Sequence, residues 1–146
     1  MIQNLTRCGV ALGLVLGATA FAAAEAELEL EPQQVASLTE RVEARWETLE
    51  ARDFDKTWEF QSPIYRASFP QHLYKYNYSY AVEWELTEIN VVAYDAQAAV
   101  ASVAVRVMSE PTKQTSVASR AIGALPVTFH EQWILIDGEW WHSANQ

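Results

Sequence analysis

The sequence predicts an α+β domain in which N-terminal helices precede an antiparallel sheet. Residues 35–52 place apolar side chains at steps of three and four, as in an amphipathic helix. Most of residues 84–136 instead alternate apolar and polar side chains, which is typical of half-buried strands. Asp137-Gly138 then separates two aromatic-rich stretches and favours the two-residue turn of a β-hairpin. A length of 146 residues fits one such domain.

The predicted first helix has one continuous apolar stripe, formed by Val35, Leu38, Val42, Trp46 and Leu49. A second, shorter helix is expected at residues 53–61, with Asp53 as its N-cap. Pro63 would end that helix, because its ring restricts the backbone of the preceding Ser62.

Two interpretations are open for residues 71–80, in which tyrosines alternate with polar residues. Taken alone, the alternation predicts a long half-buried strand that continues through Trp84. The alternative is a short helix after Pro70, followed by a strand that begins near Glu83.

Strands are expected over the rest of the chain. Residues 95–97 form a turn between the first two strands, and one face of the second strand carries Val103, Val105 and Val107. A polar connection at residues 109–116 precedes a further strand from about Arg120 to Ile136. Residues 139–144 return as the last strand.

Residues 1–24 are interpreted as a signal peptide. Arg7 precedes the apolar run GVALGLVLGATAF, which is too short and too rich in Ala and Gly for a membrane span. Cleavage after Ala22 or Ala24 fits the small residues there, and an uncleaved anchor is the alternative. We therefore expect a periplasmic or secreted protein, with residues 25–34 as an acidic flexible lead-in and residues 35–146 as a single domain.

The composition excludes several kinds of function. Cys8 is the only cysteine and lies in the predicted signal peptide, so the exported domain would hold no disulfide, cysteine nucleophile or thiolate metal site. Only Arg7 of the 10 basic and 19 acidic residues precedes residue 25, which leaves a net charge of −10. Because such a surface repels phosphates, we expect no nucleic-acid partner and no docking on anionic membranes.

The stretch RWETLEARDFDKTWEFQSPIYRASFP and the closing EQWILIDGEWW resemble the nuclear transport factor 2-like superfamily, which includes SnoaL-like and ketosteroid isomerase-like proteins. The resemblance extends over nearly the whole chain after the lead-in and rests on the order and spacing of the elements. It implies a cone-shaped α+β barrel, with N-terminal helices packed in the concavity of a curved antiparallel sheet around a pocket. It also favours the short helix at residues 71–79.

The hairpin around Asp137-Gly138 divides the closing stretch into two faces. A two-residue turn pairs Trp133 with His142 and Leu135 with Trp140, and direct partners share a face. We expect this face, with Glu131 and Phe129, to line the pocket. The full set of pocket candidates is Trp58, Tyr65, Trp84, Phe129, Glu131, Trp133 and Trp140. The opposite face is the predicted contact of a homodimer through the sheet and holds Ile134, Ile136 and Trp141.

Glu131 is the candidate catalytic residue. Some proteins of the superfamily place a polar or charged pocket residue six positions before the Asp of the Asp-Gly turn, which corresponds to Glu131. Burial between Phe129 and Trp133 would raise its pKa, as suits a general base. Alternatively, Glu131 reaches the rim of the pocket or pairs with an arginine from a helix. The first predicted helix has no Tyr to match the one that ketosteroid isomerases supply there, which argues against steroid-type chemistry.

The sequence therefore favours an exported, non-catalytic domain that binds a small apolar molecule or a protein partner through its pocket or sheet face. The alternatives are a SnoaL-like isomerase, dehydratase or hydrolase with Glu131 as general base, and an accessory subunit of an envelope complex. No metal or cofactor is expected, because His72, His130 and His142 lack ligand spacing and no Gly-rich phosphate loop is present.

Overall fold

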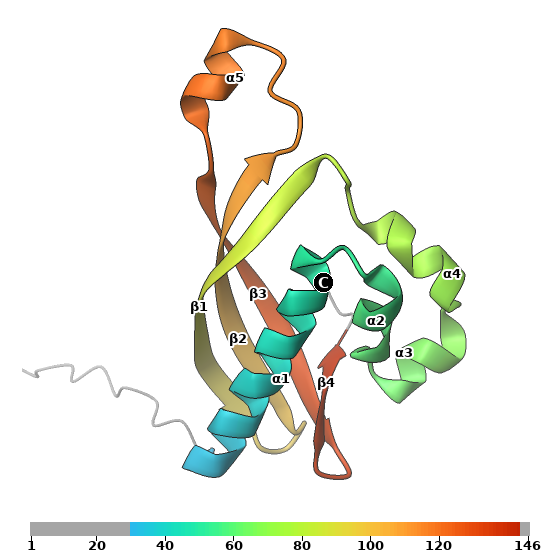
Figure 1. Cartoon of the computed structure of the whole chain (residues 1–146). Helices are drawn as coiled ribbons and strands as arrows, with labels where there is room; N and C mark the ends of the chain where they lie inside the picture. Colours follow the sequence, from blue (N-terminus) through green and yellow to red (C-terminus); the bar gives the residue numbers. More distant parts are fainter. Residues whose placement is uncertain (1–29, 144–146) are drawn as a thin grey trace, which may run out of the picture.

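The computed structural model describes residues 30–143, so the predicted signal peptide and the first half of the acidic lead-in lie outside the described residues. The predicted α+β class is confirmed, with helices followed by an antiparallel sheet (Figure 1). The elements are α1 (Pro32–Glu50), α2 (Phe54–Glu59), α3 (Pro63–Ser68), α4 (Gln71–Tyr74), the 3₁₀-helix η1 (Lys75–Asn77), β1 (Val82–Asp95), β2 (Val100–Pro111), α5 (Val117–Ile122), β3 (Leu125–Ile136) and β4 (Glu139–Ser143). No helix in this described part is long and apolar enough to cross a membrane.

Helix α1 begins three residues earlier than predicted, at Pro32. Proline suits the first turn because its missing N–H has no intrahelical partner there, and Gln34 accepts a hydrogen bond from the backbone N–H of Glu31. Leu30 is buried in the core, so the end of the predicted flexible lead-in is packed. The apolar stripe is confirmed and contributes Leu38, Val42, Trp46 and Leu49 to the core.

Pro63 has a different role from the one predicted. Helix α2 ends at Glu59, and Pro63 is the first residue of α3. Ser62 is extended, as expected before a proline, and its hydroxyl accepts a hydrogen bond from Tyr65 N–H to cap α3. The prediction that Asp53 caps α2 is confirmed by its acceptance of the Lys56 N–H at 3.2 Å.

The structure confirms the helical interpretation of residues 71–80. Gln71–Tyr74 form α4 and Lys75–Asn77 form η1, and β1 starts at Val82. The tyrosine alternation therefore does not extend the sheet. Tyr74 and Tyr78 instead point into the interior of the domain, whereas Tyr76 and Tyr80 are exposed.

The sheet has the order β1-β2-β3-β4, and every neighbour is antiparallel. The predicted hairpin register is confirmed, with Trp133 opposite His142 and Leu135 opposite Trp140. Helix α1 crosses one face of the sheet, and α2 to α4 continue beside it (Figure 1). The core between α1 and the sheet contains the predicted valine row of β2, formed by Val103, Val105 and Val107.

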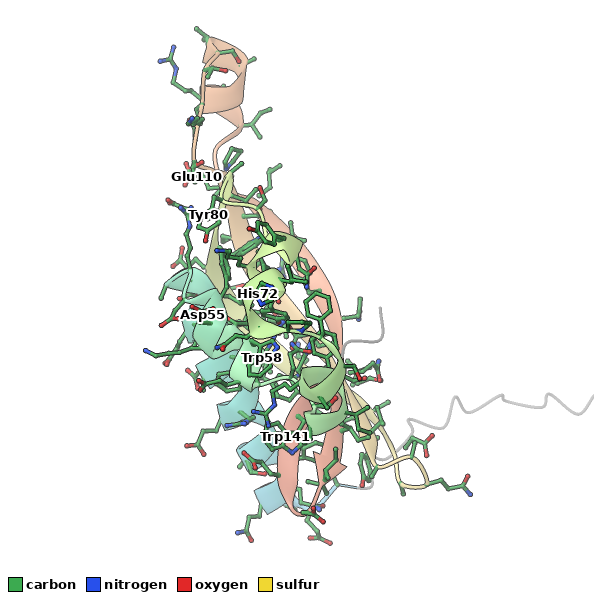
Figure 2. All side chains as sticks on the ribbon, turned by 90° about the vertical axis from the view of Figure 1, so that its right-hand side faces the viewer. Asp55, Trp58, His72, Tyr80, Glu110 and Trp141 are labelled. Atoms are coloured by element: carbon green, nitrogen blue, oxygen red, sulfur yellow. The ribbon has the colours of Figure 1, made fainter. Side chains whose placement is uncertain are left out.

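Strands β2 and β3 are joined by an arm that projects beyond the rest of the domain (Figure 1). Figure 2 shows the same arm beyond Tyr80 and Glu110, at the end far from Trp141. The prediction of a strand from Arg120 is wrong, because Val117–Ile122 form α5. Gly123 follows the helix with a φ of +63°, a conformation that ends helices and suits glycine.

Candidate functional site

Two cavities share the residues Arg45, Asn77, Tyr78 and His142. The first, here the polar cavity, has a volume of about 360 Å³ and is also lined by Gln61, Tyr65 and Tyr74. The second, here the aromatic cavity, has a volume of about 330 Å³ and is also lined by Trp46, Leu49, Ser79, Trp84, Phe129, His130 and Glu131. Both volumes lie in the range of small-molecule sites.

A buried ion pair joins α1 to β3 at the boundary between the cavities. Arg45 Nη1 lies 2.7 Å from Glu131 Oε1, and the two side chains are 5% and 6% exposed. The indole N–H of Trp46 donates to the same oxygen at 3.0 Å, and that of Trp133 donates to Glu131 Oε2 at 2.8 Å. Both carboxylate oxygens are therefore bound by donors of the same chain, which offsets the cost of burying the charge.

Arg45 also begins a chain of hydrogen bonds through the polar cavity. Its Nη2 donates to the Tyr78 hydroxyl at 3.3 Å, and the hydroxyls of Tyr78 and Tyr74 lie 2.6 Å apart. Gln61 Nε2 donates to the Tyr74 hydroxyl at 2.7 Å and lies 3.0 Å from Nδ1 of His142. The chain thus connects α1, the α4–η1 segment and β4.

Burial shapes the protonation of this chain. Burial raises the pKa of Tyr74 above its ordinary value, despite the opposing charge of Arg45. Burial, and then the charge of Arg45, lowers the pKa of His142 well below its ordinary value. Burial alone would lower the pKa of Arg45, but Glu131, Tyr78 and Tyr74 raise it overall. At neutral pH the chain therefore combines neutral Tyr74 and His142 with a charged Arg45 that is paired with Glu131.

The structure places four of the pocket candidates on the cavity walls: Tyr65 on the polar cavity, and Trp84, Phe129 and Glu131 on the aromatic cavity. Trp133 and Trp140 are on the predicted face but are buried in the core behind these walls. Trp58 lies outside both cavities, where its indole N–H donates to the Phe69 carbonyl at 3.2 Å. Of the alternatives for Glu131, the one that occurs is the pairing with a helix arginine.

Sequence reasoning missed several residues of the site. Arg45 stands three residues after Val42 and four before Leu49, so its place on the buried stripe was a signal for a buried charge that needs a partner. His142 was correctly placed opposite Trp133, but its position near the end of the chain obscured its burial. Gln61 and the Tyr74–Tyr78 pair gave no comparable signal, because their meeting depends on how α2 and α4 pack.

The face predicted to form a dimer is partly covered by the same chain. The guanidinium groups of Arg66 and Arg41 lie 4.8 and 5.2 Å from the centroid of the Trp141 ring. Ile134 and Ile136 line a shallow groove beside α3. A homodimer through this face stays a prediction.

Metal ligands do not cluster in the part of the chain that the structure describes, where no group of three or more His, Cys, Asp or Glu side chains meets. His72 and His130 lie apart from the hydrogen-bonded chain that contains His142. The groups that line the two cavities are hydroxyl, amide, guanidinium, imidazole and aromatic groups, together with the paired carboxylate of Glu131.

No protein-family model and no curated protein matches the sequence. Among solved structures, the chain is similar to Aln2 from a Streptomyces species, with a TM-score of 0.48 and 10% sequence identity. That match covers 78% of this chain and 89% of Aln2.

Proposed function

We propose that this chain is an exported domain that binds an uncharged, largely apolar small molecule in the polar and aromatic cavities, without transforming it. The aromatic cavity would hold the flat apolar body of the ligand against Trp84 and Phe129. The polar cavity would bind its oxygen atoms. The order of the elements, together with the sequence resemblance, supports a place in the nuclear transport factor 2-like superfamily.

The preference for an uncharged ligand follows from the charges at the site. The only opposite charges of the buried network, Arg45 and Glu131, already form an ion pair. His142 and Tyr74 are neutral at physiological pH because of the directions of their pKa shifts. An ionised ligand would lose its hydration here without gaining an unpaired counter-ion, and that loss is costly.

One observation carries the proposal that the ligand bears an oxygen acceptor. Tyr78 oxygen accepts from Arg45, Tyr74 oxygen accepts from Gln61, and the two hydroxyls bond to each other. A pair of hydroxyls has two protons, and only one of them can lie between the oxygens. The other is available to donate to a carbonyl or hydroxyl oxygen in the polar cavity. Arg45 Nε, which is buried, also has no acceptor among the described residues.

The alternative of an enzyme with Glu131 as general base has less support. A base must present a free lone pair to the proton that it removes, whereas Glu131 accepts hydrogen bonds from Arg45, Trp46 and Trp133. These contacts suit a carboxylate that orients Arg45. We therefore assign Glu131 a positioning role in the binding site.

The test uses two environment-sensitive naphthalene dyes that differ in charge. Prodan is uncharged and carries a ketone, whereas 1-anilinonaphthalene-8-sulfonate is an anion. We expect prodan to bind with at least tenfold higher affinity in fluorescence titrations of the purified protein. Equal affinities, or tighter binding of the sulfonate, would contradict the choice of an uncharged ligand.

A variant pair tests the donated hydroxyl. Tyr78→Phe removes a hydroxyl of the pair, so we expect prodan to bind roughly 3- to 10-fold more weakly, the cost of one neutral hydrogen bond. Tyr76→Phe is the matched control, since Tyr76 is in the same segment and 74% exposed. If both variants bound prodan like the parent protein, the acceptor oxygen would not contact the Tyr78 hydroxyl.

A further inference from the structure

The first half of β3 forms a free edge of the sheet. Strand β2 pairs with β3 from Leu125 to Ile134, but β4 pairs with it only from Gln132 to Ile136. No strand in the described part of the chain lies on the other side of Leu125–His130, and all of these residues are exposed. We call this segment the β3 edge. Its outward-facing backbone groups have no strand partner and can form hydrogen bonds with a strand of another molecule.

The β3 edge carries no lysine and no carboxylate side chain. Leu125, Val127 and Phe129 share one face, with exposures of 52%, 37% and 36%. The other face holds Pro126, Thr128 and His130. Natural edge strands commonly carry lysine, acidic side chains or proline, which oppose association. The β3 edge has only the last of these, Pro126, which lacks a backbone N–H but leaves those of Thr128 and His130 in place.

Strand β1, the other long edge of the sheet, is protected. It carries Glu83, Glu85 and Glu88. Residues at and just after the end of α1 also form hydrogen bonds with its backbone. Glu50 accepts from the Leu86 N–H at 2.5 Å, and Arg52 donates to the Val82 carbonyl at 3.3 Å. The contrast indicates that the sheet is open to association at the β3 edge.

The distribution of acidic and basic residues favours a second copy of this chain as the partner at the β3 edge. The whole chain has 19 acidic and 10 basic residues, so two copies repel each other over most of their surfaces. Residues 112–130, which comprise the arm and the β3 edge, contain no acidic residue and include Lys113 and Arg120. A second copy therefore meets no carboxylate here, and its acidic surface attracts the two cations of the arm.

We propose that two copies of this chain associate by antiparallel pairing of their β3 edges, so that their sheets join across a two-fold axis. The pairing is self-complementary, because a two-fold axis at Val127, the middle of the apolar row, sets Leu125, Val127 and Phe129 beside the same row of the second copy. Phe129 and His130 also line the aromatic cavity, so the second copy completes its wall. This contact differs from the outer-face homodimer predicted through Ile134, Ile136 and Trp141.

Sedimentation velocity of the purified protein from about 1 to about 200 μM, a range in which weak sheet-edge contacts associate, tests the pairing. The parent protein is expected to form a dimer, and Val127→Lys to raise its dissociation constant at least tenfold. Val92→Lys is the matched control, because Val92 is 58% exposed on the protected strand β1, and its dimer is expected to persist. If Val127→Lys does not fold, Thr128→Lys, on the opposite face of the edge, replaces it in the same measurement.

Two results would overturn the proposal. The first is a parent protein that stays monomeric over the whole range. The second is a dimer that Ile136→Lys dissociates while Val127→Lys and Thr128→Lys leave it intact, which would place the contact on the outer face.

Hydrogen exchange distinguishes pairing of the β3 edge with a second copy from coverage of that edge by a segment of the same chain. We expect the outward amides of Leu125–His130 to exchange slowly at the highest protein concentration and rapidly at the lowest. Equal protection at both concentrations would mean that the chain covers its own edge, and the proposal would fail.

Discussion

The two halves of β3 lie on one continuous strand but have opposite environments. Val127 and Phe129 in the first half are more than one-third exposed, whereas Glu131 and Trp133 in the second half are buried. All four side chains point to the same face of the sheet. Helix α1 binds the second half through Arg45 and Trp46, which both contact Glu131, and reaches the first half only at Phe129, whose ring lies 5.4 Å from that of Trp46. Alternation therefore tells which face is inward, and tertiary packing decides which inward residues are enclosed.

The largest effect is expected from breaking the ion pair in the covered half. Glu131→Ala leaves Arg45 charged and without its partner in the interior, which should lower the free energy of unfolding by about 3–5 kcal/mol. Urea denaturation measures the change. The control Glu83→Ala removes the exposed pair with Arg52, 3.3 Å long, and should cost less than about 1 kcal/mol. Similar losses in both variants would mean that burial of the pair has no energetic consequence.

Two valines that are direct neighbours across β2 and β3 compare a covered position with an uncovered one. Val107 is fully buried and Val127 is 37% exposed. Truncation of Val107 to alanine should cost about 2 kcal/mol, from two lost methyl groups and the space that they leave. The same change at Val127 should cost less than about 1 kcal/mol, because part of its surface stays in water. Equal costs in chemical denaturation would show that the first half of β3 is also covered in solution.

A smaller effect is expected from His142 as the pH falls. Burial lowers the pKa of folded His142, whereas the unfolded chain takes up a proton near pH 6.5. Because the unfolded state then binds more protons, the free energy of unfolding should decrease from about pH 6.5 to about pH 5, by at most about 1.4 kcal/mol per pH unit. His142→Gln should flatten the dependence, and the exposed His130→Gln should not. An unchanged slope in His142→Gln would assign the dependence to other groups.

The fold was more accessible from the sequence than the site. The stripe from Leu38 to Leu49, the valine row of β2 and the Asp137-Gly138 hairpin are local patterns, and each formed as predicted. The helix at Val117–Ile122 was missed because its six residues have no core-facing pattern. Local patterns also located Glu131 on the inward face.

The partners of Glu131 required the packed structure. Arg45 and Glu131 are 86 positions apart, and Gln61 and His142 are 81 apart, so no spacing rule connects them. Burial of a charged residue nevertheless demands a counter-charge. That demand explains why the predicted lone carboxylate forms an ion pair, and why its chemistry differs from that of a general base.

Native mass spectrometry of freshly purified protein tests the central claim most directly, since it detects a bound molecule whatever its identity. The account predicts a non-covalent adduct of small-molecule mass that the denatured protein lacks. It also predicts that the extracted compound is uncharged at neutral pH, contains an aromatic or alicyclic body and bears a carbonyl or hydroxyl oxygen. An anionic compound, or a protein that retains no adduct and also fails to bind prodan, would contradict it.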